Sequence, residues 1–173
     1  MHEAEGFTLT NAYERTGQLG PDRWYAAIGA LSLFRGTPLL VVHAGTATTV
    51  DSLFQTGDGE YRFMGGRIAP GPALMHKALL SAVPTLDSGL TEHKDFPLCS
   101  SDAITTGIID AQVGLITQAY ESMCEAGQRP KIILAGGSSR FLAPRLRTLH
   151  PTLIVRHNLV LGGLAQKVRE SKR

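Results

Sequence analysis

Apolar and polar positions along residues 39–70 follow the pattern of consecutive strands. Residues 39–51 are rich in Val and Thr and poor in charge, which predicts two strands around the turn at Ala44-Gly45. A Gly-Asp-Gly turn at residues 57–59 separates two further runs of strand-forming residues and predicts a hairpin. The stretch is therefore expected to fold as an antiparallel meander of three strands.

Two helices are predicted after the meander. Residues 73–83 have helical spacing, and the prolines just before them suit a helix start because the first turn does not use the N–H that proline lacks. Residues 100–127 repeat apolar positions at steps of three and four, with Ser100 or Ser101 as the N-cap and Gly127 as the stop. This second helix is the longest that the sequence predicts.

The C-terminal third alternates between strand and helix patterns. The predicted elements are a strand at 131–137, a helix at 138–150 interrupted early by proline, a strand at 152–157 and a helix at 158–172. Such alternation favours parallel crossover connections. The summed order, βββ, one or two helices and then βαβα, is the half-repeat of the actin-like, RNase H-like superfamily of actin and the sugar kinases. The predicted fold class is therefore an α/β actin-like half-domain with a remnant of its companion domain.

The N-terminal part is predicted to be a shorter unit of its own. Residues 1–37 hold a polar start and one helix, "DRWYAAIGALSLF", which is too little for a companion domain. We expect residues 1–37 to be a remnant of a first domain that includes a substrate-binding helix. Residues 38–173 are expected to form the second actin-like domain.

Composition narrows the function classes. The 173 residues, 43% hydrophobic and 18% charged, suffice for one domain with a real core. No apolar run of about 18 residues and no basic-then-apolar leader is seen, so a cytoplasmic protein without a membrane partner is expected. The net charge of +2 is small and evenly spread, so no nucleic-acid partner is expected, and the basic cluster at 167–173 is interpreted as a solvated tail. Cys99 and Cys124 lack metal-ligand spacing and are expected to be reduced thiols.

Three glycine-rich turns are suited to hold phosphate. "AGTATT" at 44–49 places backbone N–H groups and hydroxyls at a strand turn, although a plain Thr-rich hairpin is the alternative. "GGRIAPG" at 65–71 precedes a helix and is alternatively a tight connection. "LAGGSS" at 134–139 joins a strand to a helix start, where N–H groups lack partners. Neither GxGxxG nor a P-loop pattern occurs, which disfavours dinucleotide-binding and P-loop folds.

The "LGPDRW" stretch joins a carboxylate and a guanidinium at a helix start. Asp22 is suited to act as a general base on a substrate hydroxyl, with Arg23 positioning an anionic group. The alternative is structural: Asp22 caps the helix, and Arg23 is its surface partner.

Six motifs stand in order between residues 11 and 164: "NAYERTGQLGPDRW", "VVHAGTATTVD", "GGRIAPGPALMHKAL", "SSDAITTGI", "ILAGG" and "LVLGGL". Together they resemble type III pantothenate kinase, a family that also includes proteins named Bvg accessory factor. The resemblance implies an actin-like homodimer that uses ATP to phosphorylate pantothenate to 4'-phosphopantothenate in coenzyme A biosynthesis. It also implies a need for Mg2+ and for a monovalent cation, K+ or NH4+.

The resemblance implies roles for single residues. Asp22 matches the general base on the pantothenate hydroxyl, and Arg23 its substrate-orienting neighbour. Tyr13 and Gly20 match residues of the pantothenate pocket, and Ser100 stands where the family usually has a pantothenate-contacting threonine. The residues matched to ATP and phosphate binding are Gly45, Thr46, Thr48, Thr49, Gly136 and Gly137.

Two departures from the family pattern bear on function. His43 occupies the position of the usual aspartate that helps to bind the monovalent cation, and an imidazole does not replace an anionic oxygen ligand for a hard cation. The family's opening D-x-G-N segment, a phosphate and Mg2+ site, has no counterpart in "MHEAEGFTLT". The chain is then expected to be either a fragment or a form without half of the nucleotide cleft.

Three functions follow as alternatives from the sequence. The leading one is a pantothenate kinase. The second is a catalytically impaired relative that acts as an accessory or transcriptional regulatory factor through a dimer surface. The third, a different sugar or acid kinase, requires the Asp22-Arg23 pair to serve another hydroxyl.

Overall fold

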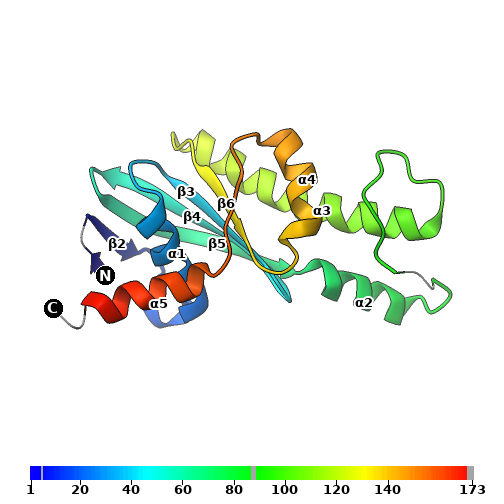
Figure 1. Ribbon diagram of the computed structural model, residues 1–173, viewed down its shortest axis with the longest axis horizontal. Coiled ribbons are helices and arrows are strands. Elements are labelled where there is room, and N and C mark those ends of the chain that lie inside the picture. The colour runs from blue at the N-terminus through cyan, green and yellow to red at the C-terminus, as the bar shows by residue number, and fades with distance from the viewer. Residues whose placement is uncertain (5, 87–88, 171–173) are drawn as a thin grey trace.

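A computed structural model describes residues 1–4, 6–86 and 89–170, in which one sheet is covered by helices on both faces (Figure 1). The strands are β1 (His2–Ala4), β2 (Phe7–Asn11), β3 (Leu39–Ala44), β4 (Ala47–Gly57), β5 (Glu60–Pro70), β6 (Lys131–Ala135) and β7 (Ile154–Val155). The order of these described strands in the sheet is β1-β2-β5-β4-β3-β6-β7. β3, β4 and β5 are antiparallel neighbours, whereas β2 pairs with β5 and β6 pairs with β3 in parallel.

The helices form a layer on each face of the sheet. They are α1 (Pro21–Leu33), α2 (Pro72–Ala82), α3 (Ser100–Glu125), α4 (Ser139–Leu149) and α5 (Leu159–Glu170), with a short 3-10 turn, η1 (Thr16–Gln18), before α1. α1 and α5 cover one face, and α3 and α4 cover the other. α2 and the beginning of α3 project together beyond the end of the sheet (Figure 1).

Strand periodicity divides the core into two clusters. Alternate residues of β3 point to opposite faces, so Leu39 and Val41 pack with α1, while Leu40 and Val42 pack with α3 and α4. All four side chains are buried, which explains the uninterrupted apolar run in β3. The central strand is thereby held from both sides, and its carboxyl end is a rigid place for a site.

The predicted meander and the alternating C-terminal elements are confirmed. β1 and β2 were not predicted, because they are short and lie in a stretch with a polar start; Phe7 and Leu9 of β2 are nevertheless buried. β2 joins the same sheet as β5, and α1 shares a core with β3. The division of the chain at residue 37 stays a prediction.

Several predicted boundaries differ from the structure. The N-cap of α3 is Cys99, whose side chain makes no capping hydrogen bond, and not Ser100 or Ser101. Pro144 lies inside α4 without interrupting it, and the strand expected at 152–157 is reduced to the two residues of β7. Gly127, with a φ of 79°, does follow α3 as expected. The predicted end of the last helix, at residue 172, lies outside the described residues.

Glycines let α1 and α5 approach each other closely. A Cβ on Gly29 would collide with the backbone oxygen of Leu159, and a Cβ on Gly163 would collide with the backbone oxygen of Tyr25. Gly162 differs, because its Cβ would lie 4.0 Å from the nearest atom, the Gly29 Cα. The two glycines of "LVLGGL" therefore have different roles, and only the second is required for helix packing.

We expect Gly163→Ala to lower the free energy of unfolding by about 1–3 kcal/mol, because the added methyl group forces the two backbones apart. Gly162→Ala is the matched control, and it is expected to be neutral or to stabilise by up to about 1 kcal/mol through helix propensity. Urea denaturation of the two variants measures the difference. Equal stabilities would contradict the close backbone contact.

Candidate active site

A buried ion pair joins the first turn of α1 to the middle of β4. Arg23 is 7% exposed and Asp51 is 1% exposed. Arg23 donates from Nε and Nη2 to Oδ1 of Asp51, at 2.9 and 2.5 Å, and from Nη1 to the hydroxyl of Tyr13 at 2.9 Å. The guanidinium also lies over the rings of Tyr13 and Phe63, with its carbon 5.8 and 5.6 Å from their centroids.

Local hydrogen bonds bring Tyr13 to this pair. The side chain of Asn11, at the end of β2, accepts a hydrogen bond from the Tyr13 backbone N–H at 2.9 Å and donates to the Thr16 carbonyl at 3.3 Å. An asparagine that bonds the backbone two residues later stabilises a turn. The "NAYERTG" stretch is thus folded so that the Tyr13 hydroxyl faces Arg23.

Gly66 of β5 leaves the space that the ion pair fills. A Cβ at this position would collide with Asp51 Oδ1 and would lie 2.5 Å from Arg23 Nη2. Gly66 pairs with Asp51 in the sheet. The "GGR" motif and the "DRW" motif, distant in sequence, are therefore parts of one arrangement.

Burial and the partner's charge have opposite effects on the pKa of each residue in the ion pair. Burial raises the pKa of Asp51 to about 6; hydrogen bonding and the charge of Arg23 oppose this effect, and the nearby charge of Asp22 adds to it. Burial alone would lower the pKa of Arg23, but the hydrogen bond and charge of Asp51 raise it overall. At neutral pH both partners are charged.

Asp22 stands beside this pair but is exposed. It lies in the first turn of α1, whose N-cap is Gly20 with no side-chain capping bond. A Cβ at Gly20 would lie 2.6 Å from Oδ1 of Asp22, so the glycine leaves room for the carboxylate. The interpretation of Asp22 as cap and Arg23 as its surface partner is therefore wrong, because Arg23 is buried against Asp51.

The turn between β3 and β4 holds Gly45 and the exposed Thr46. Its backbone is fixed by hydrogen bonds from the Gly45 N–H to the Ala47 carbonyl, at 3.0 Å, and from the Gly71 N–H to the Thr46 carbonyl, at 2.8 Å. Thr48 is fully buried, and its hydroxyl makes no hydrogen bond to any described residue. Thr49 lies on the Asp51 side of β4, where burial raises the pKa of Asp51 and the Thr49 side chain weakly opposes that rise. Of the three threonines, Thr46 is exposed, Thr48 is buried, and Thr49 lies near Asp51.

The Gly136-Gly137 pair follows β6 and lies against the end of β3. Gly136 has a φ of 95°, and a Cβ on it would collide with the backbone of Ala44. The Ser138 N–H donates to the Ala44 carbonyl at 3.0 Å. His43 and both glycines line one cavity of about 310 Å³, together with residues that begin α5. The structure therefore brings the β3–β4 turn, His43 and the glycine pair to one end of the sheet.

Ser100 is exposed and begins α3 in the projecting part of the molecule. Tyr13, Gly20, Asp22 and Arg23 lie instead at and before the start of α1. Within this chain the matched pantothenate residues therefore come from two different elements.

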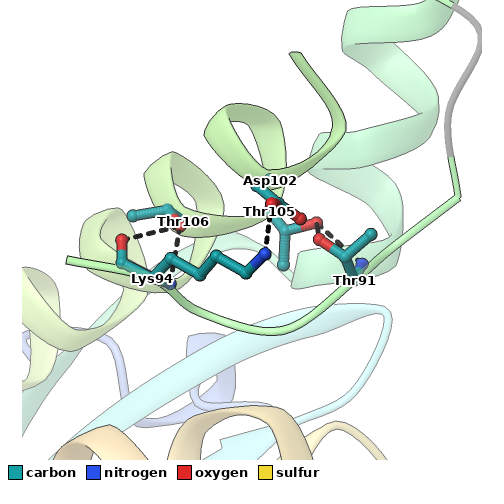
Figure 2. Close-up of polar contacts among 5 residues, drawn as sticks. All are labelled: Thr91, Lys94, Asp102, Thr105 and Thr106. Atoms are coloured by element: carbon teal, nitrogen blue, oxygen red, sulfur yellow. Dashed lines mark hydrogen bonds and ion pairs between the residues drawn. The ribbon is translucent and has the colours of Figure 1, made fainter. Parts of the chain in front are cut away.

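The loop that carries Thr91 and Lys94 is hydrogen-bonded to the first turns of α3 (Figure 2). Thr105 Oγ1 accepts the Thr91 N–H at 2.9 Å, and Thr106 Oγ1 accepts the Lys94 N–H at 3.1 Å. Lys94 Nζ donates to Asp102 at 2.6 Å, and this bond lowers the pKa of Asp102. Sequence reasoning missed these contacts, although the "DAITTG" hydroxyls on one helix side were a usable signal.

Within the described parts of the chain, no three or more His, Cys, Asp or Glu side chains are grouped as a metal site would require. None of the helices in those parts is long and apolar enough to cross a membrane.

The family model and the related sequences that match this chain point to the same family. The family model described as type III pantothenate kinase matches residues 1–122. A type III pantothenate kinase of Methylobacillus flagellatus is 38% identical over 159 residues, covering 90% of this chain and 64% of the relative. That of Burkholderia ambifaria is 40% identical over 169 residues, covering 91% and 62%. The chain spans about three fifths of the length of these relatives.

Solved structures show the same fold. A conserved Baf family protein from Campylobacter jejuni matches with a TM-score of 0.67 and 24% identity, covering 96% of this chain and 70% of that one. A pCBH ParM variant matches with a TM-score of 0.52 and 13% identity, covering 90% and 53%. The predicted actin-like fold class is confirmed.

We expect Arg23→Met to lower the free energy of unfolding by about 3–5 kcal/mol at pH 8, because Asp51 is left buried and unpaired. Without Arg23 the folded-state pKa of Asp51 rises further above its unfolded value, so the folded variant takes up a proton as pH falls. The stability of the variant is therefore lost as pH rises from about 4 through the raised pKa, at up to about 1.4 kcal/mol per unit. Urea denaturation at pH 5, 7 and 8 measures this trend.

The matched control is the double variant Arg23→Met, Asp51→Asn, which removes the titrating group. The free energy of unfolding of the double variant is expected to exceed that of the single variant, and the difference should be largest at pH 8. A deficit of the single variant that is the same at pH 5 and pH 8 would show that the buried charge is not its cause.

Proposed function

Because the chain belongs to the type III pantothenate kinase family, we propose that it carries out ATP-dependent phosphorylation of pantothenate to 4'-phosphopantothenate. The observation that carries this proposal is the exposed carboxylate of Asp22 beside the buried, charge-paired Arg23. A carboxylate in this position is accessible to a substrate hydroxyl, while its neighbour is fixed in one orientation. The product belongs to coenzyme A biosynthesis, by resemblance to the family.

In this proposal Asp22 accepts the proton of the pantothenate hydroxyl as the hydroxyl oxygen bonds to the γ-phosphorus of ATP, and the bond from that phosphorus to the bridging oxygen breaks to release ADP. General bases of this kind contribute about 100- to 10,000-fold to a rate. Tyr13, Gly20 and Arg23 are proposed to contact pantothenate beside Asp22. The Asn11 turn holds Tyr13, and Gly66 makes room for the ion pair of Arg23. Positioning of this kind supplies much of the catalysis in phosphoryl transfer.

ATP is proposed to bind at the carboxyl ends of β3 and β6. Gly45, Thr46 and Thr49 would lie along the phosphates, and Gly136 and Gly137 beside the adenosine. Thr48 is assigned to this site only through its place beside the turn, since its own side chain is fully buried. The hydrogen bonds at Gly45 and Ser138 support the proposal, because they hold both turns in place before a ligand arrives.

Mg2+ is expected to arrive with ATP. Mg2+ typically keeps several waters and uses substrate phosphates with one or two carboxylates, rather than a dedicated protein cage. The absence of a three-residue acidic or His/Cys cluster among the described residues is compatible with such binding. When bound, the ion would neutralise charge on the transferred phosphoryl group.

A homodimer is part of the proposal, and the projecting part of the molecule is its candidate contact surface. Large apolar side chains are exposed there on α2 and on the loop before α3. They are Leu74, Leu79, Val83, Phe96 and Leu98, and the last two are 88% and 97% exposed. A second copy would cover this surface and bring Ser100 of one chain towards its partner.

We expect Asp22→Asn to reduce pantothenate phosphorylation by about 100-fold or more, because the general base is lost. Asp58→Asn, which changes an exposed acid in the β4–β5 turn, is the matched control and should retain full activity. Phosphate transfer from labelled ATP to pantothenate measures both. A folded chain that neither binds nor phosphorylates pantothenate would contradict the proposal and favour the accessory or regulatory alternative.

We expect sedimentation equilibrium to give a dimer at micromolar concentration. Leu98→Asp should shift the protein to the monomer, because a charge is placed in the apolar contact. Leu33→Asp, at an exposed apolar position of α1, is the control and should leave the dimer intact. A wild-type monomer at micromolar concentration counts against the dimer.

A further inference from the structure

His43 lies between the Gly45 turn and the Gly136-Gly137 turn. It is the penultimate residue of β3, and its neighbours across the sheet are Thr49 of β4 and Ala135 of β6. Its ring packs over Gly45, since a Cβ on Gly45 would lie 3.3 Å from the ring Cε1 and 3.6 Å from Nδ1. The same side chain lines the cavity of about 310 Å³ beside Gly136 and Gly137. The imidazole therefore stands between the two turns.

The side chains around this cavity do not supply the carboxylate that a monovalent cation would use. Such an ion prefers carboxylate and carbonyl oxygens, and the family resemblance places a carboxylate at position 43. The described side chains that line the cavity include two imidazoles, of His43 and His157, and the amide of Asn158, but no Asp or Glu. The remaining lining residues are glycine or apolar.

The same lining does fit an anionic oxygen. An imidazole has at least one N–H to donate in either protonation state, and phosphate oxygens are strong acceptors. Gly137 presents no side chain to the cavity, and a Cβ there would meet nothing within 4 Å, so a ligand can approach its backbone. Asp51, on the neighbouring strand β4, is paired with Arg23.

We infer that His43 replaces the monovalent cation: its ring N–H binds a phosphate oxygen, with His157 as a second donor, so phosphate binding by this chain needs no K+ or NH4+. The inference rests on the proposed function only in identifying the natural ligand as a nucleotide. The phosphate-binding chemistry itself is independent of pantothenate and is tested without it.

The experiment titrates the protein with pyrophosphate by calorimetry, in K+ and then in tetramethylammonium at equal ionic strength. The wild-type dissociation constant is expected to be the same in both salts. His43→Phe keeps a ring of similar shape but removes the donor, and it should weaken binding about 10- to 100-fold in both salts. His43→Asp should bind still more weakly in tetramethylammonium and should recover part of the loss in K+.

A second measurement uses the wild-type protein alone and so does not depend on the folding of a variant. The ring nitrogen resonances of His43 and His157 should shift on addition of pyrophosphate. His93, paired with Asp110 at 2.9 Å, and His150, paired with Thr117 at 3.2 Å, are internal controls that should not shift.

The outcomes separate this inference from the proposed function. Wild-type affinity that falls when K+ is removed, absence of pyrophosphate binding, or a silent His43 resonance each overturns the inference. Cation-independent binding through His43 in a protein that does not phosphorylate pantothenate would uphold the inference and reject the kinase.

Discussion

The contact between Arg23 and Asp51 is the constraint on which the candidate site depends. Removing two charges from water is costly, and here the cost is offset by two hydrogen bonds to one oxygen, a third to Tyr13 and two aromatic rings. The pair fixes the first turn of α1 to the middle of the sheet. Asp22, the residue just before Arg23, thereby receives a defined position while remaining exposed.

The other half of the site depends on backbone contacts rather than charges. β3 is buried on both faces, and the turn that follows β6 is joined to the end of β3 by a hydrogen bond from the Ser138 N–H to the Ala44 carbonyl. Glycine is required at Gly136 because any side chain would collide with that backbone. A site built on the carboxyl ends of parallel neighbours such as these is typical of α/β sheets, where ligands bind beyond the strand ends.

The sequence predicted those parts of the fold that local patterns determine. The meander and the long α3 have strong period-two and helical spacing, whereas β1 and β2 are short and precede a turn shaped by the side chain of Asn11. The "DRW" motif was recognised, but its partner Asp51 was not, because 28 residues and a change of element separate them. An acid inside the otherwise uncharged strand "TTVDSL" was the available signal. The burial of Thr48 follows from strand alternation and could have been predicted from the same pattern.

The close crossing of α1 and α5 has a consequence for how the chain folds. Gly29 and Gly163 are far apart in sequence, yet each fits against the other's helix. During synthesis α1 therefore emerges long before α5, and the side of α1 that packs on α5 stays uncovered until residues 159–170 are made. Loop closure over such a distance is slow and leaves apolar surface accessible to other chains. One side of the helix that carries Asp22 is thus among the last surfaces of the molecule to be covered.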